Sequence, residues 1–198
     1  MGLDSAGRTQ LHHKGKLVIG VENTPTVIFD LMQFLVIDLG GVVGQIGMGQ
    51  HGTAFAHAGM RMGPAICYEG LYGDFYGDFV RRGAQFMAII SNDGWWGDTP
   101  GYKHLFTISR LRAIEHRRAI ARSANTGMSG FISARGDIGE TLGWEKRGVI
   151  SAAVPLNSEL TFYTRYGDYL GRISEYLTLL CVLYYIAYRV KRKNYLVK

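Results

Sequence analysis

Hydrophobic positions fall into short runs that alternate with longer helical patterns. Residues 63–68 and 86–91 are apolar runs bounded by Gly, Asn and Asp, which is typical of buried strands. Residues 72–84, between these runs, predict a helix. Residues 104–118 predict the clearest helix, because apolar residues recur at every third position from Leu105 onward.

Weaker patterns predict further short elements. They are a strand at 16–18, a helix or core segment at 26–39, a glycine-rich loop at 40–52, a turn at 135–137, and strands at 119–123, 127–133 and 148–154. Strands that alternate with helices and end in a hairpin are typical of a layered domain. The fold class is therefore predicted as α/β.

The C-terminal segment differs from the rest of the chain. Residues 176–188 carry no charge, yet they are fewer than the about 20 residues that a membrane span needs. Extended to 170–190, the segment would form a helix of about 31 Å, with Arg172 near one end, where its long side chain can reach the membrane surface. Basic residues after Tyr188 favour a cytoplasmic end. An amphipathic helix docked on the core is the alternative.

Charge placement argues against nucleic-acid binding. The chain of 198 residues has 22 Lys and Arg against 16 Asp and Glu, which gives a net charge of +6. Five of the positive charges lie after Tyr188, so the rest of the chain is nearly neutral. No groove-wide field for binding phosphates is expected from such a balance.

Cofactor and metal signatures are weak. The glycines at 47–52 match GxGxxG, but no helical pattern opens at the third glycine, as a dinucleotide site requires. The six His residues lack metal-ligand spacing, and the two Cys residues form no CxxC pair. The sequence therefore predicts neither a cofactor nor a metal.

Cys67 occupies a position suited to chemistry. It ends an apolar run and precedes Tyr68, Glu69 and a glycine, so it is expected where a buried strand turns into a helix. Helix N-terminal amides favour a thiolate and can stabilise an oxyanion. Glu69, Lys14 and Glu22 are candidates for the proton acceptor and the cation that a thiolate needs. The alternative is that Cys67 is a buried small hydrophobe.

Five short motifs occur in a fixed order along the chain. They are KGKLVIGVE at 14–22, AICYE at 65–69, SNDGWWG at 91–97, RAIE at 112–115 and RSANTG at 122–127. Together they resemble the carbon-nitrogen hydrolase (nitrilase) superfamily. The Lys-to-Glu spacing, CYE, NDGWWG and the apolar C-terminal helix with a basic end narrow the resemblance to the apolipoprotein N-acyltransferases.

The resemblance implies a domain plan and a set of site residues. It implies a partial nitrilase-like αββα sandwich over 1–168, a transmembrane helix over 169–190 and a basic cytoplasmic tail over 191–198. It also implies a Glu-Lys-Cys triad, with Cys67 as the nucleophile and Lys14 as the cation that stabilises the tetrahedral oxyanion.

The remaining site residues are carried over by motif position. Glu22 and Glu69 match acidic positions that support the family's site, and solvated carboxylates are the alternative reading. Trp95 and Trp96 would shape an acyl pocket, and plain core residues are the alternative.

The function implied is transfer of a fatty acyl group from a phospholipid, through a Cys thioester, to the N-terminal amine of a diacylglyceryl-cysteine lipoprotein. The protein would lie in the bacterial inner membrane, with the catalytic domain on the periplasmic side and the C-terminus in the cytoplasm. Alternatives are an amidase of the same superfamily that hydrolyses a C–N bond, and an inactive membrane-anchored fragment.

Two departures from the family pattern affect this expectation. The family's general-base glutamate lies upstream of the lysine, where this sequence has only Asp4 in no matching motif. The membrane helices that precede the domain in the family have no counterpart here. The chain is therefore expected to be the C-terminal part of a longer protein, and the chain expressed alone is not expected to turn over.

Overall fold

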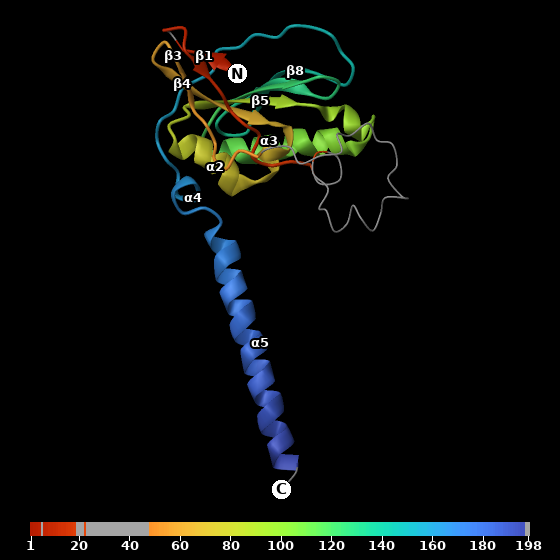
Figure 1. Cartoon of the computed structure of the whole chain (residues 1–198). Helices are drawn as coiled ribbons and strands as arrows, with labels where there is room; N and C mark the ends of the chain where they lie inside the picture. The colour runs from red at the N-terminus through yellow and green to blue at the C-terminus, as the bar shows by residue number, and fades with distance from the viewer. Residues whose placement is uncertain (5, 19–21, 23–47, 197–198) are drawn as a thin grey trace.

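A computed structural model of the chain describes residues 1–4, 6–18, 22 and 48–196 (Figure 1). The helix or core segment expected at 26–39 and most of the loop expected at 40–52 lie outside this described part. Residues 48–52 are free of regular secondary structure, as the loop prediction requires.

Eight strands are present in the described residues. A six-stranded mixed sheet has the order β3–β4–β5–β6–β7–β8, in which β4, β5 and β6 are parallel and the outer neighbours are antiparallel. Its strands are β3 (Phe55–His57), β4 (Met60–Ile66), β5 (Phe86–Ser91), β6 (Ile120–Ala124), β7 (Ser129–Ile132) and β8 (Ile138–Leu142). A separate two-stranded ribbon joins β1 (Gly2–Leu3) and β2 (Thr9–Gln10).

The helical elements connect these strands and extend the chain beyond them. They are η1 (Cys67–Leu71), α2 (Gly73–Arg81), η2 (Asp93–Trp96), α3 (Pro100–His116), α4 (Phe162–Tyr166) and α5 (Tyr169–Leu196). The helices α2 and α3 lie below the central strands, while α5 projects away from the α/β domain (Figure 1).

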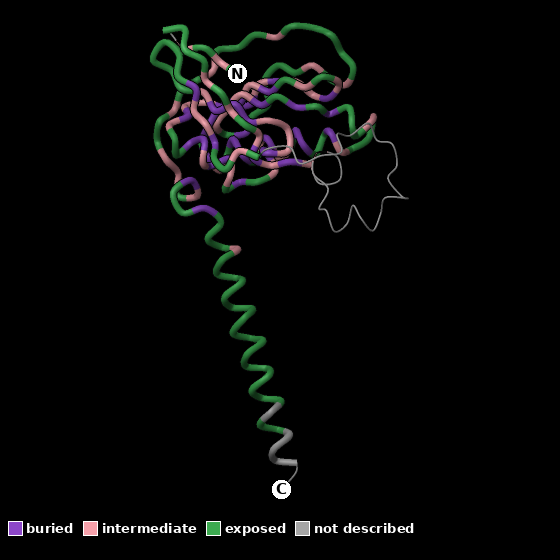
Figure 2. Tube along the Cα trace, viewed as in Figure 1, coloured by how far each residue is buried: buried purple, intermediate pink, exposed green. Residues whose placement is uncertain are grey.

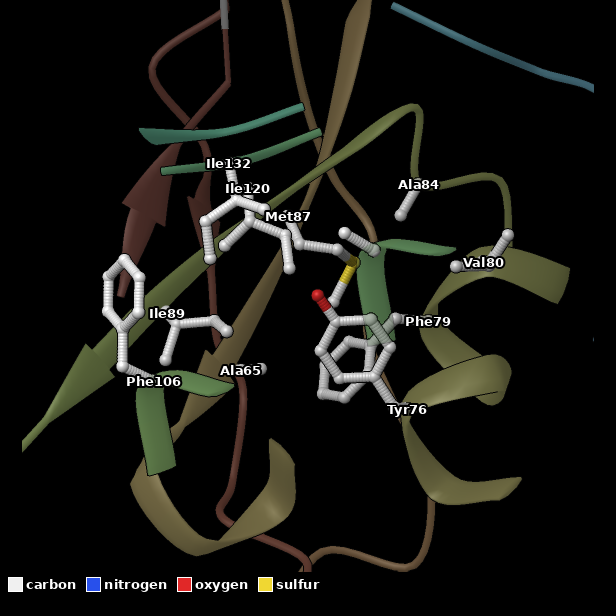
Figure 3. Packing of buried hydrophobic residues seen from close by; sticks show 11 residues of the cluster. Ala65, Tyr76, Phe79, Val80, Ala84, Met87, Ile89, Phe106, Ile120 and Ile132 are labelled. Carbon is white, nitrogen blue, oxygen red and sulfur yellow. The ribbon is translucent and has the colours of Figure 1, made fainter. Parts of the chain in front are cut away.

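The hydrophobic core lies between the sheet and these two helices. Successive strand residues point to opposite faces, so Met87 and Ile89 of β5 face the core while Ile90 points to the other side and is 62% exposed. Figure 3 shows Tyr76 and Phe79 of α2 directed at the core-facing residues of the strands. This packing fixes the strand ends from which the site is built.

Most strong sequence patterns were confirmed, and several weak ones were wrong. The strand β5 and the helices α2 and α3 occur where periodicity predicts them. Residues 16–18 and 148–154 form no strand, and neither segment pairs with another strand among the described residues. The strand β8 was missed because its residues are mostly exposed, so it shows no apolar alternation.

The short helix α4 is attached to α2 and α3 by buried polar contacts. Thr164 is fully buried, and its Oγ1 lies 2.9 Å from Nδ1 of His116. Thr161 donates a hydrogen bond to the backbone oxygen of Glu115 at 2.6 Å, and Arg81 donates to the backbone oxygen of Thr164 at 2.9 Å. These bonds hold the end of the domain from which α5 starts.

The helix α5 is the feature least explained by packing within the chain. Within Tyr169–Arg189, a window of 18 residues has a mean hydropathy of 1.3, and none of that window is buried. Figure 2 shows α5 exposed along nearly its whole described length, in contrast to the purple and pink interior of the domain. The helix is long and apolar enough to cross a membrane.

Burial of His116 predicts a pH dependence of stability. Desolvation, with the nearby charge of Arg112, lowers the pKa of His116 from 6.5 to about 3. The folded protein therefore binds fewer protons than the unfolded chain between those values, so this contribution to stability is present above pH 6.5 and is lost as the pH falls. Each pH unit in that window costs about 1.4 kcal/mol.

The measurement is urea unfolding in mild detergent at pH 7 and pH 5. We expect His116→Gln to remove about 2 kcal/mol of the difference in unfolding free energy between these pH values. His104→Gln, at an exposed position of the same helix, is the control and should keep the full difference. An equal pH dependence in all three proteins would show that His116 is not the group responsible.

Candidate active site

Cys67 lies where the parallel strand β4 ends and η1 begins. It adopts a left-handed backbone conformation with a φ of 47°, although it is not a glycine. A non-glycine residue in this region costs about 1–3 kcal/mol, so the surrounding contacts must hold the turn in place. The turn predicted after the apolar run is therefore present, and it is strained at the thiol-bearing residue.

A pocket of about 510 Å³ opens at this turn. Its lining combines ionisable groups with a larger number of apolar side chains. The lining residues are Lys14, Val18, Glu22, Ile66, Cys67, Tyr68, Ile90, Asn92, Trp95, Trp96 and Leu105. The pocket thus brings together three of the four residues predicted to be catalytic and both predicted pocket tryptophans.

Lys14 and Glu22 form an ion pair in the pocket wall. The Lys14 Nζ atom lies 2.6 Å from both carboxylate oxygens of Glu22. Glu22 also accepts a hydrogen bond from the backbone nitrogen of Val18 at 2.8 Å. The side chains are only 15% and 30% exposed, so the pair is partly desolvated and its geometry is restrained. A cation is thereby positioned in the same pocket as Cys67.

Glu69 does not line the pocket, because its carboxylate points into the protein and is fully buried. It accepts hydrogen bonds from the backbone nitrogens of Gly15 at 2.6 Å and Ile66 at 2.7 Å. The first contact lies beside Lys14, and the second lies immediately before Cys67. Glu69 therefore joins the lysine segment to the cysteine turn, which is a positioning role in this geometry.

His12 is a buried partner of Glu69 that sequence reasoning missed. Its Nε2 atom lies 3.1 and 3.2 Å from the two Glu69 oxygens, and both side chains are almost inaccessible to solvent. The His12 ring therefore lies in hydrogen-bond contact with the carboxylate that joins the lysine segment to the cysteine turn. No motif could have identified the contact, since the two residues are 57 positions apart.

A second buried ion pair supports η2, which carries the tryptophans. The guanidinium of Arg122 donates two hydrogen bonds to the Asp93 carboxylate, at 2.9 and 3.0 Å. Ser91 also donates to Asp93, at 2.6 Å. A β-carbon at Gly127 would lie 2.0 Å from an Asp93 oxygen, so only glycine fits there. This packing explains why the SNDGWWG and RSANTG motifs occur together.

The pocket can support covalent catalysis by a thiol. Its lining contains the thiol of Cys67, the amine of Lys14 and an apolar wall of Trp95, Trp96 and Ile90, which are the kinds of group that such chemistry on an acyl substrate needs. Within residues 1–4, 6–18, 22 and 48–196, no three His, Cys, Asp or Glu side chains are grouped as metal ligands. The arrangement fits an acyl group with an apolar chain bound next to the cysteine.

Comparison with known proteins identifies the family to which this sequence is similar. Residues 3–160 match the carbon-nitrogen hydrolase family. The apolipoprotein N-acyltransferase of Chlorobaculum tepidum is 37% identical over 169 residues, which cover 83% of this chain and 32% of that protein. The apolipoprotein N-acyltransferase of Rhizobium meliloti is 42% identical over 97 residues, which cover 49% of this chain and 18% of that protein.

The chain spans about a third of the length of the Chlorobaculum tepidum relative. Among solved structures, an amidase from Nesterenkonia sp. AN1 aligns with a TM-score of 0.44 and 15% identity, and the alignment covers 66% of this chain and 51% of that chain.

Replacing the Glu69 carboxylate should weaken the hydrogen bonds that hold the pocket segments together, and so lower the stability of the protein. Glu69→Gln keeps the side-chain size but offers an NH₂ group where buried donors need an acceptor. We expect the unfolding free energy to fall by about 1–3 kcal/mol, the usual cost of leaving buried donors unpaired.

The control is Glu140→Gln, because Glu140 is exposed on β8. An exposed substitution of this kind should change the unfolding free energy by less than about 0.5 kcal/mol. Urea unfolding of the two variants, followed by circular dichroism, makes the comparison. If Glu69→Gln matches Glu140→Gln, the buried carboxylate does not hold the pocket segments together.

Proposed function

The chain belongs to the carbon-nitrogen hydrolase family, and from that premise we propose that it carries the catalytic centre of a lipoprotein N-acyltransferase. The enzyme moves a fatty acyl group from a phospholipid to the N-terminal amine of a diacylglyceryl-cysteine lipoprotein. The observation that carries the proposal is one pocket that holds Cys67, the Lys14–Glu22 pair and an apolar wall. The names of the relatives supply the lipoprotein substrate class.

In the first step, the Cys67 thiolate attacks the carbonyl carbon of the phospholipid ester. A C–S bond forms, and the resulting oxyanion is stabilised by the Lys14 ammonium. The C–O bond then breaks, and the lysophospholipid oxygen takes up a proton as it leaves. The acyl chain remains on Cys67 as a thioester, against Trp95 and Trp96.

In the second step, the free amine of the lipoprotein attacks the thioester carbonyl. The C–S bond breaks, an amide forms, and the thiolate of Cys67 is restored as the amine loses a proton. Because one product leaves before the second substrate reacts, the kinetics should be ping-pong. Both lipid substrates suit a pocket with a largely apolar lining.

Proton transfer needs a base, and Glu22 is the carboxylate among the described residues that line the pocket. Glu22 is engaged by Lys14 at 2.6 Å, which restricts its use as a free base. Asp4 accepts hydrogen bonds from Arg8 and from the backbone nitrogen of Ala6, so it is already occupied in its own turn. General acid and base assistance is worth roughly 10²- to 10⁴-fold in rate, so phospholipid turnover that relies on Glu22 or Asp4 in these arrangements should be slower by about that factor.

The proposal places the α/β domain on the periplasmic side of the bacterial inner membrane. Its support is the exposed apolar stretch of α5 up to Tyr188, which is followed in the same helix by Arg189, Lys191 and Arg192. Basic residues at the end of a span favour the cytoplasm, so the C-terminal tail would lie there. The acyl donor would then be a phospholipid of the same membrane.

An activated acyl donor separates nucleophilic attack from the need for a proton donor. A p-nitrophenyl ester of palmitate releases a stable phenolate, so the thiol can be acylated without general-acid help. We expect intact-protein mass spectrometry to show one palmitoyl group, removable by hydroxylamine and located on Cys67. Cys67→Ser should lose this label, and Cys181→Ser, which alters the exposed cysteine of α5, should keep it.

The fate of the acyl group then tests the transfer step. Added diacylated lipopeptide should receive palmitate as an amide faster than water releases free palmitate. Faster hydrolysis than aminolysis would favour an amidase of the same family. A label on Cys181, or none on either cysteine, would remove Cys67 as the nucleophile.

A further inference from the structure

We propose that an aromatic collar at the base of the domain lies in the headgroup layer of the bilayer and sets the orientation of the pocket above it. The collar consists of Phe162, Tyr166 and Tyr169 with the neighbouring Arg165. This inference rests on the proposed function, because it takes α5 to span a membrane. It assigns a lipid-binding role to α4, which takes no part in the acyl-transfer chemistry.

The collar residues are exposed aromatic side chains that pack on one another. Phe162 and Tyr166 are 61% and 56% exposed, and Tyr169 is 36% exposed. The Phe162 ring centroid lies 4.5 Å from that of Tyr166 and 5.1 Å from that of Tyr169. Aromatic rings with polar tips are enriched at membrane interfaces, where one side of the ring is apolar and the other is hydrated.

The first and last tyrosines of the apolar stretch of α5, Tyr169 and Tyr188, are separated by about the thickness of a bilayer, and Tyr176 lies between them. Tyr184, Tyr185 and Tyr188 lie at the far end of the apolar stretch and are also exposed. At ~1.5 Å per residue, the distance from Tyr169 to Tyr188 is about 28 Å, close to the ~30 Å of the hydrocarbon core. The collar therefore stands at one boundary and these tyrosines at the other.

Basic side chains lie at the collar level. Arg165 is exposed on α4. Arg172 lies one turn inside α5, yet its guanidinium reaches back to donate hydrogen bonds to the backbone oxygens of Tyr166 and Asp168. Its charge is thus carried toward the domain end of the helix, as expected for an arginine near a membrane surface. Both positive charges suit the phosphates of lipid headgroups.

Hydrogen bonds and buried side chains attach the collar to the domain. Its other face is anchored through Thr164 and His116, which are both fully buried. The turn between α4 and α5 has Gly167 at a φ of 66°, and the Asp74 carboxylate of α2 accepts a hydrogen bond from the next backbone nitrogen at 3.1 Å. Figure 1 shows α4 beside α2, where α5 leaves the domain. Contact between the collar and lipid would therefore orient the whole domain.

A bilayer is favoured over a second protein by the continuity of the surface. The Phe162 ring packs on Tyr169, the first residue of α5, and α5 is then exposed along nearly its whole described length (Figure 2). A protein partner on the collar would have to contact the lipid-facing helix as well, whereas one bilayer covers both. A second copy of the chain is treated as an outcome of the test below.

The test measures the depth of single labels in the full chain. In a Cys67→Ser, Cys181→Ala background, Tyr166→Cys reports on the collar, Leu179→Cys on the middle of α5, and Val149→Cys on a 95% exposed site of the domain. Each protein carries an environment-sensitive fluorophore and is reconstituted in phosphatidylcholine–phosphatidylglycerol vesicles. Quenchers are lipids spin-labelled at the headgroup, lipids spin-labelled deep in the acyl chain, and iodide in water.

The headgroup quencher should reduce the fluorescence at position 166 more than the other quenchers do. The deep quencher should have the largest effect at position 179. At position 149, only iodide should reduce the fluorescence strongly. Phe162→Cys, measured in the same way, should behave like Tyr166→Cys, so the loss of one ring does not decide the result. If position 179 responds to the deep quencher while 162 and 166 respond only to iodide, the collar is wrong and the span stands.

Two other results would also contradict the proposal that the collar lies in the headgroup layer. A label at 179 that is insensitive to the deep quencher would show that α5 does not span, which contradicts the membrane part of the proposed function as well. If labels at position 166 quench one another but are not quenched by the spin-labelled lipids, the collar is an interface between copies of the chain. Acylation of Cys67 is measured separately, so none of these results depends on the chemistry.

Discussion

The site depends on the hydrogen bonds made by the buried carboxylate of Glu69. This carboxylate receives hydrogen bonds from Gly15, Ile66 and His12, which come from two distant parts of the chain. A buried charge is stable only where several donors compensate for the loss of water, so these segments are held in one arrangement. That arrangement brings the strained turn at Cys67 and the Lys14 segment to one pocket.

A buried acid also supports the part of the pocket wall that carries Trp95 and Trp96. Asp93 is fully buried and is neutralised by the two-point contact with Arg122, while Ser91 completes its hydrogen bonding. The short helix η2 therefore starts from a fixed point, and Trp95 and Trp96 extend from it toward the pocket. Two buried acids thus hold the polar side and the apolar side of one cavity, and neither acid lines it.

The junction with α5 attaches the apolar helix to the domain through residues that do not line the pocket. His116 remains neutral in its buried position, because desolvation lowers its pKa, and it meets a hydroxyl of Thr164 rather than a carboxylate. This neutral contact ties α4 to the domain, together with the hydrogen bond that Arg81 donates to the backbone oxygen of Thr164. The pocket and the helix are consequently parts of one body, and the orientation of one restricts the orientation of the other.

The sequence alone determined the elements that rest on local periodicity, such as β5 and α3, and the position of Cys67 at a strand end. It also gave the family through its ordered motifs. It could not show that Glu69 faces inward or that His12 is its partner, because side-chain direction at a strained turn depends on which distant segment packs behind it. The edge strand β8 was missed for a related reason, since its pairing with β7 is made by backbone hydrogen bonds and leaves little apolar pattern. Only the tertiary structure decided these contacts, because they join residues far apart in the chain.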